Sequence, residues 1–91
     1  MLFMVIERFK NRDAEAIYRR YREYGRMMPE GLHYVGSWIE TNYDRCFQLM
    51  ECDDPRLFDQ WTTHWQDLME FEIVPVITSQ AAVETFKPQL S

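Results

Sequence analysis

The chain contains few of the residues that several common functional sites require. It has only three glycines, all isolated, together with four prolines and two cysteines in 91 residues. Phosphate-binding loops need clustered glycines that let backbone N–H groups approach the phosphate, and no such cluster is present. A G-x-S-x-G sequence, typical of serine hydrolases of the α/β type, is also missing. The absence of both motifs argues against a protein with a phosphate-binding loop and against a serine hydrolase of this type.

Long apolar runs and an excess of basic charge are missing as well. No stretch approaches the ~20 apolar residues of a membrane-spanning helix, and the short apolar start reaches Glu7 and Arg8 too soon for a signal peptide. The net charge is −5, whereas domains that bind nucleic acid are usually basic. We therefore expect a cytoplasmic protein that binds neither a membrane nor nucleic acid.

Neither a disulfide nor a metal site is predicted. Cys46 and Cys52 lie six residues apart in one strand-like segment, which places them on the same side but too far apart to bond. His64 and Asp67 have a helical i,i+3 spacing, but a metal site needs three or four convergent ligands. We expect buried, reduced cysteines and no cofactor.

What the chain does contain is apolar and aromatic: 46% of its residues are hydrophobic and 15% aromatic. The length fits a single domain covering residues 1–91. Strand-like segments are short and rich in β-branched and aromatic residues, whereas helical segments have apolar residues at steps of three and four. The expected elements are a strand at 2–9, a helix at 13–28, strands at 32–41 and 45–52, a helix capped by Asp54 and begun by Pro55, a strand at 70–78 and a short helix from Ser79.

This βαββαβ order predicts an α+β, ferredoxin-like fold with an additional short C-terminal helix. Its simplest closed form is a four-stranded antiparallel sheet in the order 4-1-3-2, with the two main helices on one face. Pro75 agrees with this order because proline lacks the N–H that a central strand needs, and the last strand is an edge.

The first strand is apolar on both of its sides. Leu2, Met4 and Ile6 alternate with apolar residues that face the opposite way, and two helices on one face cannot cover both sets. A large exposed apolar face is unusual in a soluble monomer, so we expect a homodimer that pairs two sheets face to face. The alternative is a monomer whose C-terminal helix lies across that face. The arginine-rich segment 8–26 and the acidic segment 51–72 are either two solvated surfaces or complementary patches in an assembly.

Four segments carry a resemblance to a known family. They are MLFMVIERFKNRD at 1–13, GRMMPEGLHYVGSWIE at 25–40, DRCFQLMECDDPRLFDQW at 44–61 and WQDLMEFEIVPV at 65–76. The chain resembles a family of small bacterial proteins catalogued as a domain of unknown function. That family in turn resembles the dimeric α/β-barrel superfamily, which includes cofactor-free monooxygenases, haem-degrading enzymes, stress-responsive proteins and muconolactone isomerases. The resemblance implies a dimeric barrel with a pocket between the sheet and the helices of each subunit.

The same resemblance does not imply haem binding. The haem-degrading members use an asparagine in the first strand and a tryptophan in the third, and Glu7 and Met50 stand at the matching positions here. Only a histidine on the second helix, His64, has a counterpart.

Glu7 and His64 are the candidate acid or base groups. A glutamate among apolar strand residues has a raised pKa if it is buried, and a histidine titrates near neutral pH. The alternatives are a strand-end glutamate paired with Arg8 or Arg45, and a half-buried helix histidine with one hydrogen bond.

Four further residues are candidate ligand contacts in the pocket between the sheet and the helices. His33 could line the same pocket. The alternatives for the tryptophans are core or interface packing for Trp38 and helix packing for the Trp61–Trp65 pair. The candidate ligand-binding residues are Trp38, Gln48, Trp61 and Glu72.

Two functions follow from these candidates. The first is binding of a small apolar or aromatic molecule, with or without cofactor-free oxygenase or isomerase chemistry. The second is a non-catalytic homodimeric interaction or stress-accessory module. Whether the protein is an enzyme stays open at this point.

Overall fold

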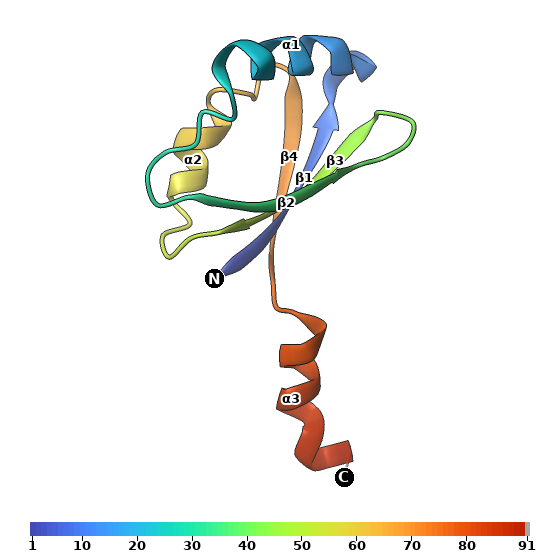
Figure 1. Ribbon diagram of the computed structural model, residues 1–91, viewed down its shortest axis with the longest axis vertical. Helices are drawn as coiled ribbons and strands as arrows, with labels where there is room; N and C mark the ends of the chain where they lie inside the picture. The colour runs from blue at the N-terminus through green and yellow to red at the C-terminus, as the bar shows by residue number, and fades with distance from the viewer. Residues whose placement is uncertain (91) are drawn as a thin grey trace.

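The computed structural model describes residues 1–90, with side chains up to Phe86, and its elements follow the predicted order (Figure 1). They are β1 (Leu2–Phe9), the 3-10 turn η1 (Lys10–Arg12), α1 (Ala14–Tyr24), β2 (His33–Ile39), β3 (Arg45–Glu51), α2 (Leu57–Thr62), β4 (Met69–Val76) and α3 (Ser79–Leu90).

The four strands form one antiparallel sheet in the order β2-β3-β1-β4, which confirms the predicted α+β topology. β1 is central and pairs with both β3 and β4. Pro75 lies in the edge strand β4, where a missing backbone N–H is tolerated.

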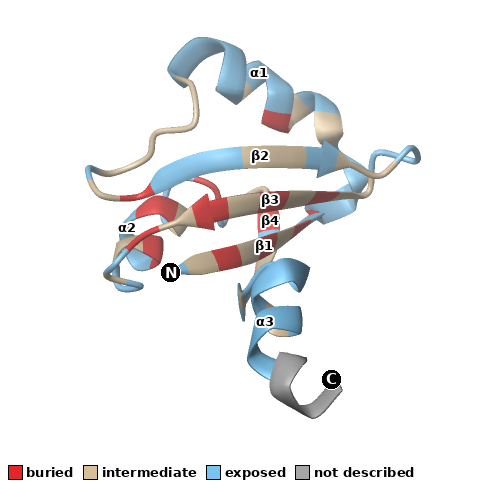
Figure 2. Cartoon of the chain, turned by 60° about the horizontal axis from the view of Figure 1, so that its bottom comes forward, coloured by how far each residue is buried: buried red, intermediate tan, exposed pale blue. Residues whose placement is uncertain are grey.

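Strand alternation gives the sheet one covered face and one open face. On the covered face, β1 and β3 place alternate residues against α1 and α2 (Figures 1 and 2). These buried residues are Phe3, Val5, Glu7 and Phe9 on β1, and Cys46, Gln48 and Met50 on β3. The core is therefore a single layer between this face and the two helices.

Aromatic side chains fix α2 to the sheet. Phe3 meets Phe58 edge to face at 5.1 Å between ring centres, and Trp61 meets Phe71 at 5.4 Å. Trp61 is only 2% exposed, so its removal would open a large cavity at a cost of about 3–5 kcal/mol in unfolding free energy.

Both main helices are shorter than predicted. The helix expected over 13–28 ends at Tyr24, because Gly25 adopts φ 70° and ψ −157°, a region that is essentially reserved for glycine. Asp13 caps α1 by accepting a hydrogen bond from the Ala16 backbone N–H. α2 begins only at Leu57, and the Asp54 carboxylate instead accepts the Arg56 N–H in the preceding turn.

The open face carries apolar side chains that no element covers. Trp38 is 59% exposed, and Val74 is also exposed. α3 leads away from the sheet rather than across it, and its Val83 and Phe86 are exposed (Figure 1). Thr78, not Ser79, caps α3, since its hydroxyl oxygen accepts the Ala81 N–H. The arrangement in which the C-terminal helix covers the open face is therefore not found.

Candidate functional site

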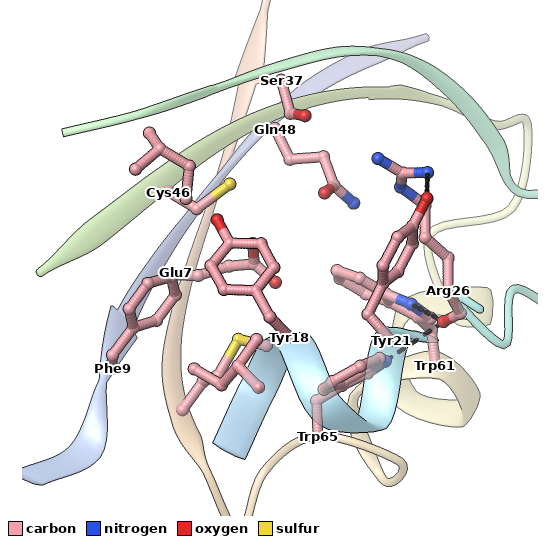
Figure 3. Close-up of a pocket in the computed structure, with 13 residues that line it drawn as sticks. Glu7, Phe9, Tyr18, Tyr21, Arg26, Ser37, Cys46, Gln48, Trp61 and Trp65 are labelled. Carbon is pink, nitrogen blue, oxygen red and sulfur yellow. Dashed lines mark hydrogen bonds between the residues drawn. The ribbon is translucent and has the colours of Figure 1, made fainter. Parts of the chain in front are cut away.

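A cavity of about 150 Å³ lies between the covered face of the sheet and the helices (Figure 3). Apolar side chains from β1, α1 and β4 form much of its wall, among them Phe9, Ile17 and Met69. Polar groups from three different parts of the chain also reach it. They are Glu7 on β1, Gln48 on β3 and Arg26 in the segment after α1.

Glu7 is the buried acidic group of this cavity. β1 places it on the covered face, opposite Cys46 of β3 and Phe71 of β4, where it is only 4% exposed. Burial raises its pKa from the usual 4.5 to about 7, while a hydrogen bond with the Cys46 thiol and the Arg26 charge lower it. Its carboxyl group can therefore gain or lose a proton near neutral pH.

No ion pair neutralises Glu7 within the described part of the chain. Arg45, one of the two partners considered above, instead donates from Nε and Nη2 to both carboxylate oxygens of Glu40, at 2.7 and 2.9 Å. Arg8, the other, lies on the opposite side of β1 and is exposed. The carboxyl group of Glu7 is thus available to a molecule in the cavity.

Gln48 is a second buried polar side chain directed into the cavity (Figure 3). It is 5% exposed, and its amide nitrogen makes one weak hydrogen bond, to the Met50 sulfur at 3.8 Å. Sulfur is a weak acceptor, so most of the hydrogen-bonding capacity of this amide remains free. Ser37, its partner on β2, lines the same part of the wall.

Arg26 is held at both its backbone and its side chain. The indole N–H groups of Trp61 and Trp65 both donate to the Arg26 carbonyl oxygen, at 2.9 and 3.1 Å (Figure 3). Its guanidinium carbon lies 3.7 Å from the ring centre of Tyr34 and 5.1 Å from that of Tyr21. Arg26 Nη1 also donates to the Tyr21 hydroxyl at 3.2 Å.

The other groups around Glu7 keep their protons at neutral pH. Burial raises the pKa of the Cys46 thiol to about 12, with a further contribution from the charge of Glu7. Burial is also the main cause of the raised pKa of Tyr18. Neither group competes with Glu7 for proton exchange near pH 7.

Three of the six predicted site residues meet at the cavity: Glu7, Gln48 and Trp61. Trp38 and Glu72, which were expected to line the same space, do not line this cavity. Trp38 pairs with Phe47 and Glu72 with Ile6, which places both on the open face. His33 is exposed at the start of β2, and it does not line the cavity either.

His64 also lies away from the cavity. Its predicted position assumed a helix running through Trp65, but α2 ends at Thr62, and His64 is exposed in the turns that follow. Its backbone carbonyl accepts a hydrogen bond from Arg20 at 2.9 Å. The structure gives its side chain no place at the cavity wall.

The sequence did not point to Arg26, Tyr18, Tyr21 or Cys46 as parts of a site. The tyrosines have the three- and four-residue spacing of an apolar helix stripe, which favours core packing, whereas both remain about 40% exposed at the cavity rim. Arg26 belongs to the arginine-rich segment 8–26, for which the sequence predicts either a solvated surface or a complementary patch in an assembly. In the sequence, only Gly25 indicates that the helix ends before Arg26, so that Arg26 lies outside the helix.

Within residues 1–86, no group of three or more potential metal ligands converges. In the described part of the chain, no helix has both the length and the apolar character needed to cross a membrane.

No curated protein matches the chain. A family model described as a domain of unknown function, DUF3303, matches residues 1–90. The chain therefore belongs to the DUF3303 family.

Proposed function

We propose that the protein binds a small molecule in the cavity between its sheet and helices, and that Glu7 exchanges a proton with this molecule. The observation that carries the proposal is Glu7 itself, a 4%-exposed carboxyl group with no ion pair among the described residues, at the wall of a cavity. Burying an acidic group without a cation destabilises a fold, and such groups are concentrated at functional sites.

The size and lining of the cavity favour a compact, largely apolar ligand. A cavity of about 150 Å³ holds a molecule about as large as benzene. Trp61, Trp65 and Phe9 offer aromatic surface, while Gln48 and Glu7 offer hydrogen bonds at fixed positions. A few placed polar groups in an apolar pocket are typical of small-molecule sites.

Proton transfer by Glu7 suits an isomerisation. The carboxylate removes a proton from one carbon of the ligand and returns it to another, so no co-reactant is consumed. The likeness to dimeric α/β-barrel proteins supports this chemistry, as that superfamily includes cofactor-free isomerases and monooxygenases. In a monooxygenase of this type, a CH2 group of the ligand would supply the electrons: one oxygen atom of dioxygen would become its carbonyl oxygen, and the other would leave as water with the two hydrogens.

We propose further that two copies pair through their open faces into a dimeric barrel. Trp38 and Val74 expose apolar surface there, and a second copy would remove it from water. The cavity lies on the other side of the sheet, so pairing would leave each subunit with its own pocket. A non-catalytic interaction module is the second candidate, favoured by this same face and by the exposed Val83 and Phe86 of α3.

Native mass spectrometry of the protein taken directly from a cell extract, compared with its denatured mass, tests these proposals. We expect a dimer that carries additional small-molecule mass, and less of this mass in a Glu7→Gln variant than in wild type. Glu23→Gln, which changes an exposed carboxylate on α1, is the matched control. A dimer with no bound mass would favour the interaction module, and a monomer would contradict pairing.

A further inference from the structure

We infer that the cavity takes a flat apolar acid, with its carboxylate bound by Arg26 and its apolar part among the aromatic side chains of the wall. This inference rests on the proposed small-molecule function and adds to it the charge and class of the ligand.

Four other arginines each donate two hydrogen bonds to one carboxylate, which is the paired geometry that guanidinium groups favour. The pairs are Arg12–Asp44, Arg20–Asp67, Arg45–Glu40 and Arg56–Asp54. Arg26 has no such partner among the described residues, although the chain has an excess of acidic groups.

Arg26 is fixed in place without an ion pair to a carboxylate among the described residues. The rings of Tyr34 and Tyr21 lie against the guanidinium, and stacking of this kind leaves the N–H groups at its edge free. One of these groups donates to the Tyr21 hydroxyl, which is uncharged. The two indole hydrogen bonds hold the Arg26 backbone, so binding an anion would require little further ordering of this residue.

A neutral hydrogen-bond donor with spare capacity lines the same cavity as this cation. The Gln48 side chain enters the cavity on the same side as the guanidinium of Arg26 (Figure 3). The Gln48 side chain is 5% exposed, and its amide nitrogen has only the Met50 sulfur as a hydrogen-bond partner. A carboxylate that meets Arg26 could also accept a hydrogen bond from this amide.

Glu7 lines the same cavity and would repel a bound anion in its ionised form. The groups that face it are the Cys46 thiol from β3, Tyr18 from α1, the Arg26 charge and the uncharged Phe71 and Trp61. Cys46 and Tyr18 do not release protons near pH 7. Binding of an acid should therefore be coupled to protonation of Glu7 and should weaken as the pH rises from 6 to 8.

Isothermal titration calorimetry with matched aromatic probes tests this inference. The probes are benzoate and phenylacetate as acids, benzyl alcohol as a neutral analogue and benzylamine as a cation. We expect the acids to bind more tightly than the other two, and more tightly at pH 6 than at pH 8. In Arg26→Gln, acid affinity should fall roughly tenfold to a hundredfold, as expected for loss of a charged hydrogen bond.

Two further variants separate the role of Arg26 from general damage. Arg26→Lys keeps the positive charge but not the two parallel N–H donors of the guanidinium group. Its loss of acid affinity should therefore be smaller than that of Arg26→Gln. Arg22→Gln removes an exposed arginine of α1 and should leave acid binding unchanged. Circular dichroism establishes that each variant is folded.

The outcomes distinguish this inference from the proposed function. If benzyl alcohol binds as tightly as benzoate, or if Arg26→Gln binds benzoate as wild type does, the ligand is not an acid held by Arg26, but the cavity still binds small molecules. If none of the probes binds at millimolar concentration, the inference is overturned. If, in addition, the protein from cell extract carries no bound molecule, the proposed function fails as well.

Discussion

The guanidinium group of Arg26 lies 3.7 Å from the ring centre of Tyr34, which joins the segment after α1 to the edge strand β2 across the cavity rim. Tyr34 is 41% exposed, so this stacking occurs at a partly solvated position. Cation–aromatic contacts of this kind contribute about 0.5–1 kcal/mol at exposed sites. The contact therefore positions Arg26 more than it stabilises the fold.

Replacing Tyr34 with alanine should lower the free energy of unfolding by about 1 kcal/mol, because the stacked ring is lost. Tyr34→Phe is the matched control, since it keeps the ring and removes only the hydroxyl, which lies 2.8 Å from the Ser37 hydroxyl. Urea unfolding measures both. Equal losses in the two variants would assign the effect to the hydroxyl contact and not to the stacking.

Glu7→Gln should change how stability depends on pH. The folded-state pKa of Glu7, about 7, lies above the usual 4.5, so the folded protein holds this proton more tightly than the unfolded chain does. The stability contributed by the protonated form is full below about pH 4.5 and is lost as the pH rises through about 7. A neutral glutamine avoids this loss.

Chemical unfolding of wild type and Glu7→Gln at pH 5, 6, 7 and 8 measures the effect. The variant should gain on wild type as pH rises, by up to roughly 3 kcal/mol at pH 8. Glu23→Gln should follow the wild-type curve throughout. If wild type and Glu7→Gln lose stability in parallel between pH 5 and 8, Glu7 is not the titrating group.

Trp38→Lys should weaken self-association. The side chain is 59% exposed on the open face, so the substitution leaves the core intact while placing a charge in the proposed interface. We expect the dimer dissociation constant to rise by about tenfold or more, as judged by sedimentation over a range of protein concentrations. Tyr24→Lys is the control, because Tyr24 is similarly exposed, at 62%, but lies on α1. Equal behaviour of the two variants would contradict pairing through the open face.

Gly25→Ala should destabilise the protein by about 1–3 kcal/mol, since alanine is strained at φ 70° and ψ −157°. An added methyl group would meet nothing within 4 Å, so the loss would come from the backbone alone. Gly36→Ala is the control, because Gly36 does not have a positive φ. An added Cβ there would lie 3.5 Å from the Trp38 ring, which is an ordinary van der Waals contact. Thermal unfolding should show a clearly lower midpoint for Gly25→Ala than for Gly36→Ala.

The sheet could be predicted from the sequence because strand alternation and the position of Pro75 leave few arrangements open. The same alternation places Glu7 and Gln48 on one face of the sheet: β1 pairs Glu7 with Cys46 and Val5 with Gln48, so the two side chains are offset by two residues on neighbouring strands. Trp38 and Glu72 were misplaced because one uncertain residue in a hairpin or strand register moves a side chain to the opposite face. The bulge between Tyr34 and Gly36 is a local irregularity of this kind.

The helices show a different kind of error. An apolar stripe with helical spacing continues past Thr62 to Trp65, and these side chains do pack in the core, although the backbone there forms turns. The stripe reports which residues are buried and not how far the helix extends. Arg26 illustrates the consequence, because its role depends on where α1 ends and on contacts with Trp61 and Trp65, far away in the sequence.

Both edges of the sheet carry features that oppose the addition of another strand. β4 has Pro75 and the exposed charges of Glu70 and Glu72, while β2 is interrupted by its bulge at residue 35. Prolines, charges and bulges at edges prevent neighbouring molecules from extending the hydrogen-bonded ladder. The proposed contact through the apolar face would close after two molecules, whereas contact through an edge could continue without limit. The sheet can therefore expose an apolar face to other proteins and still have little tendency to extend into fibrils.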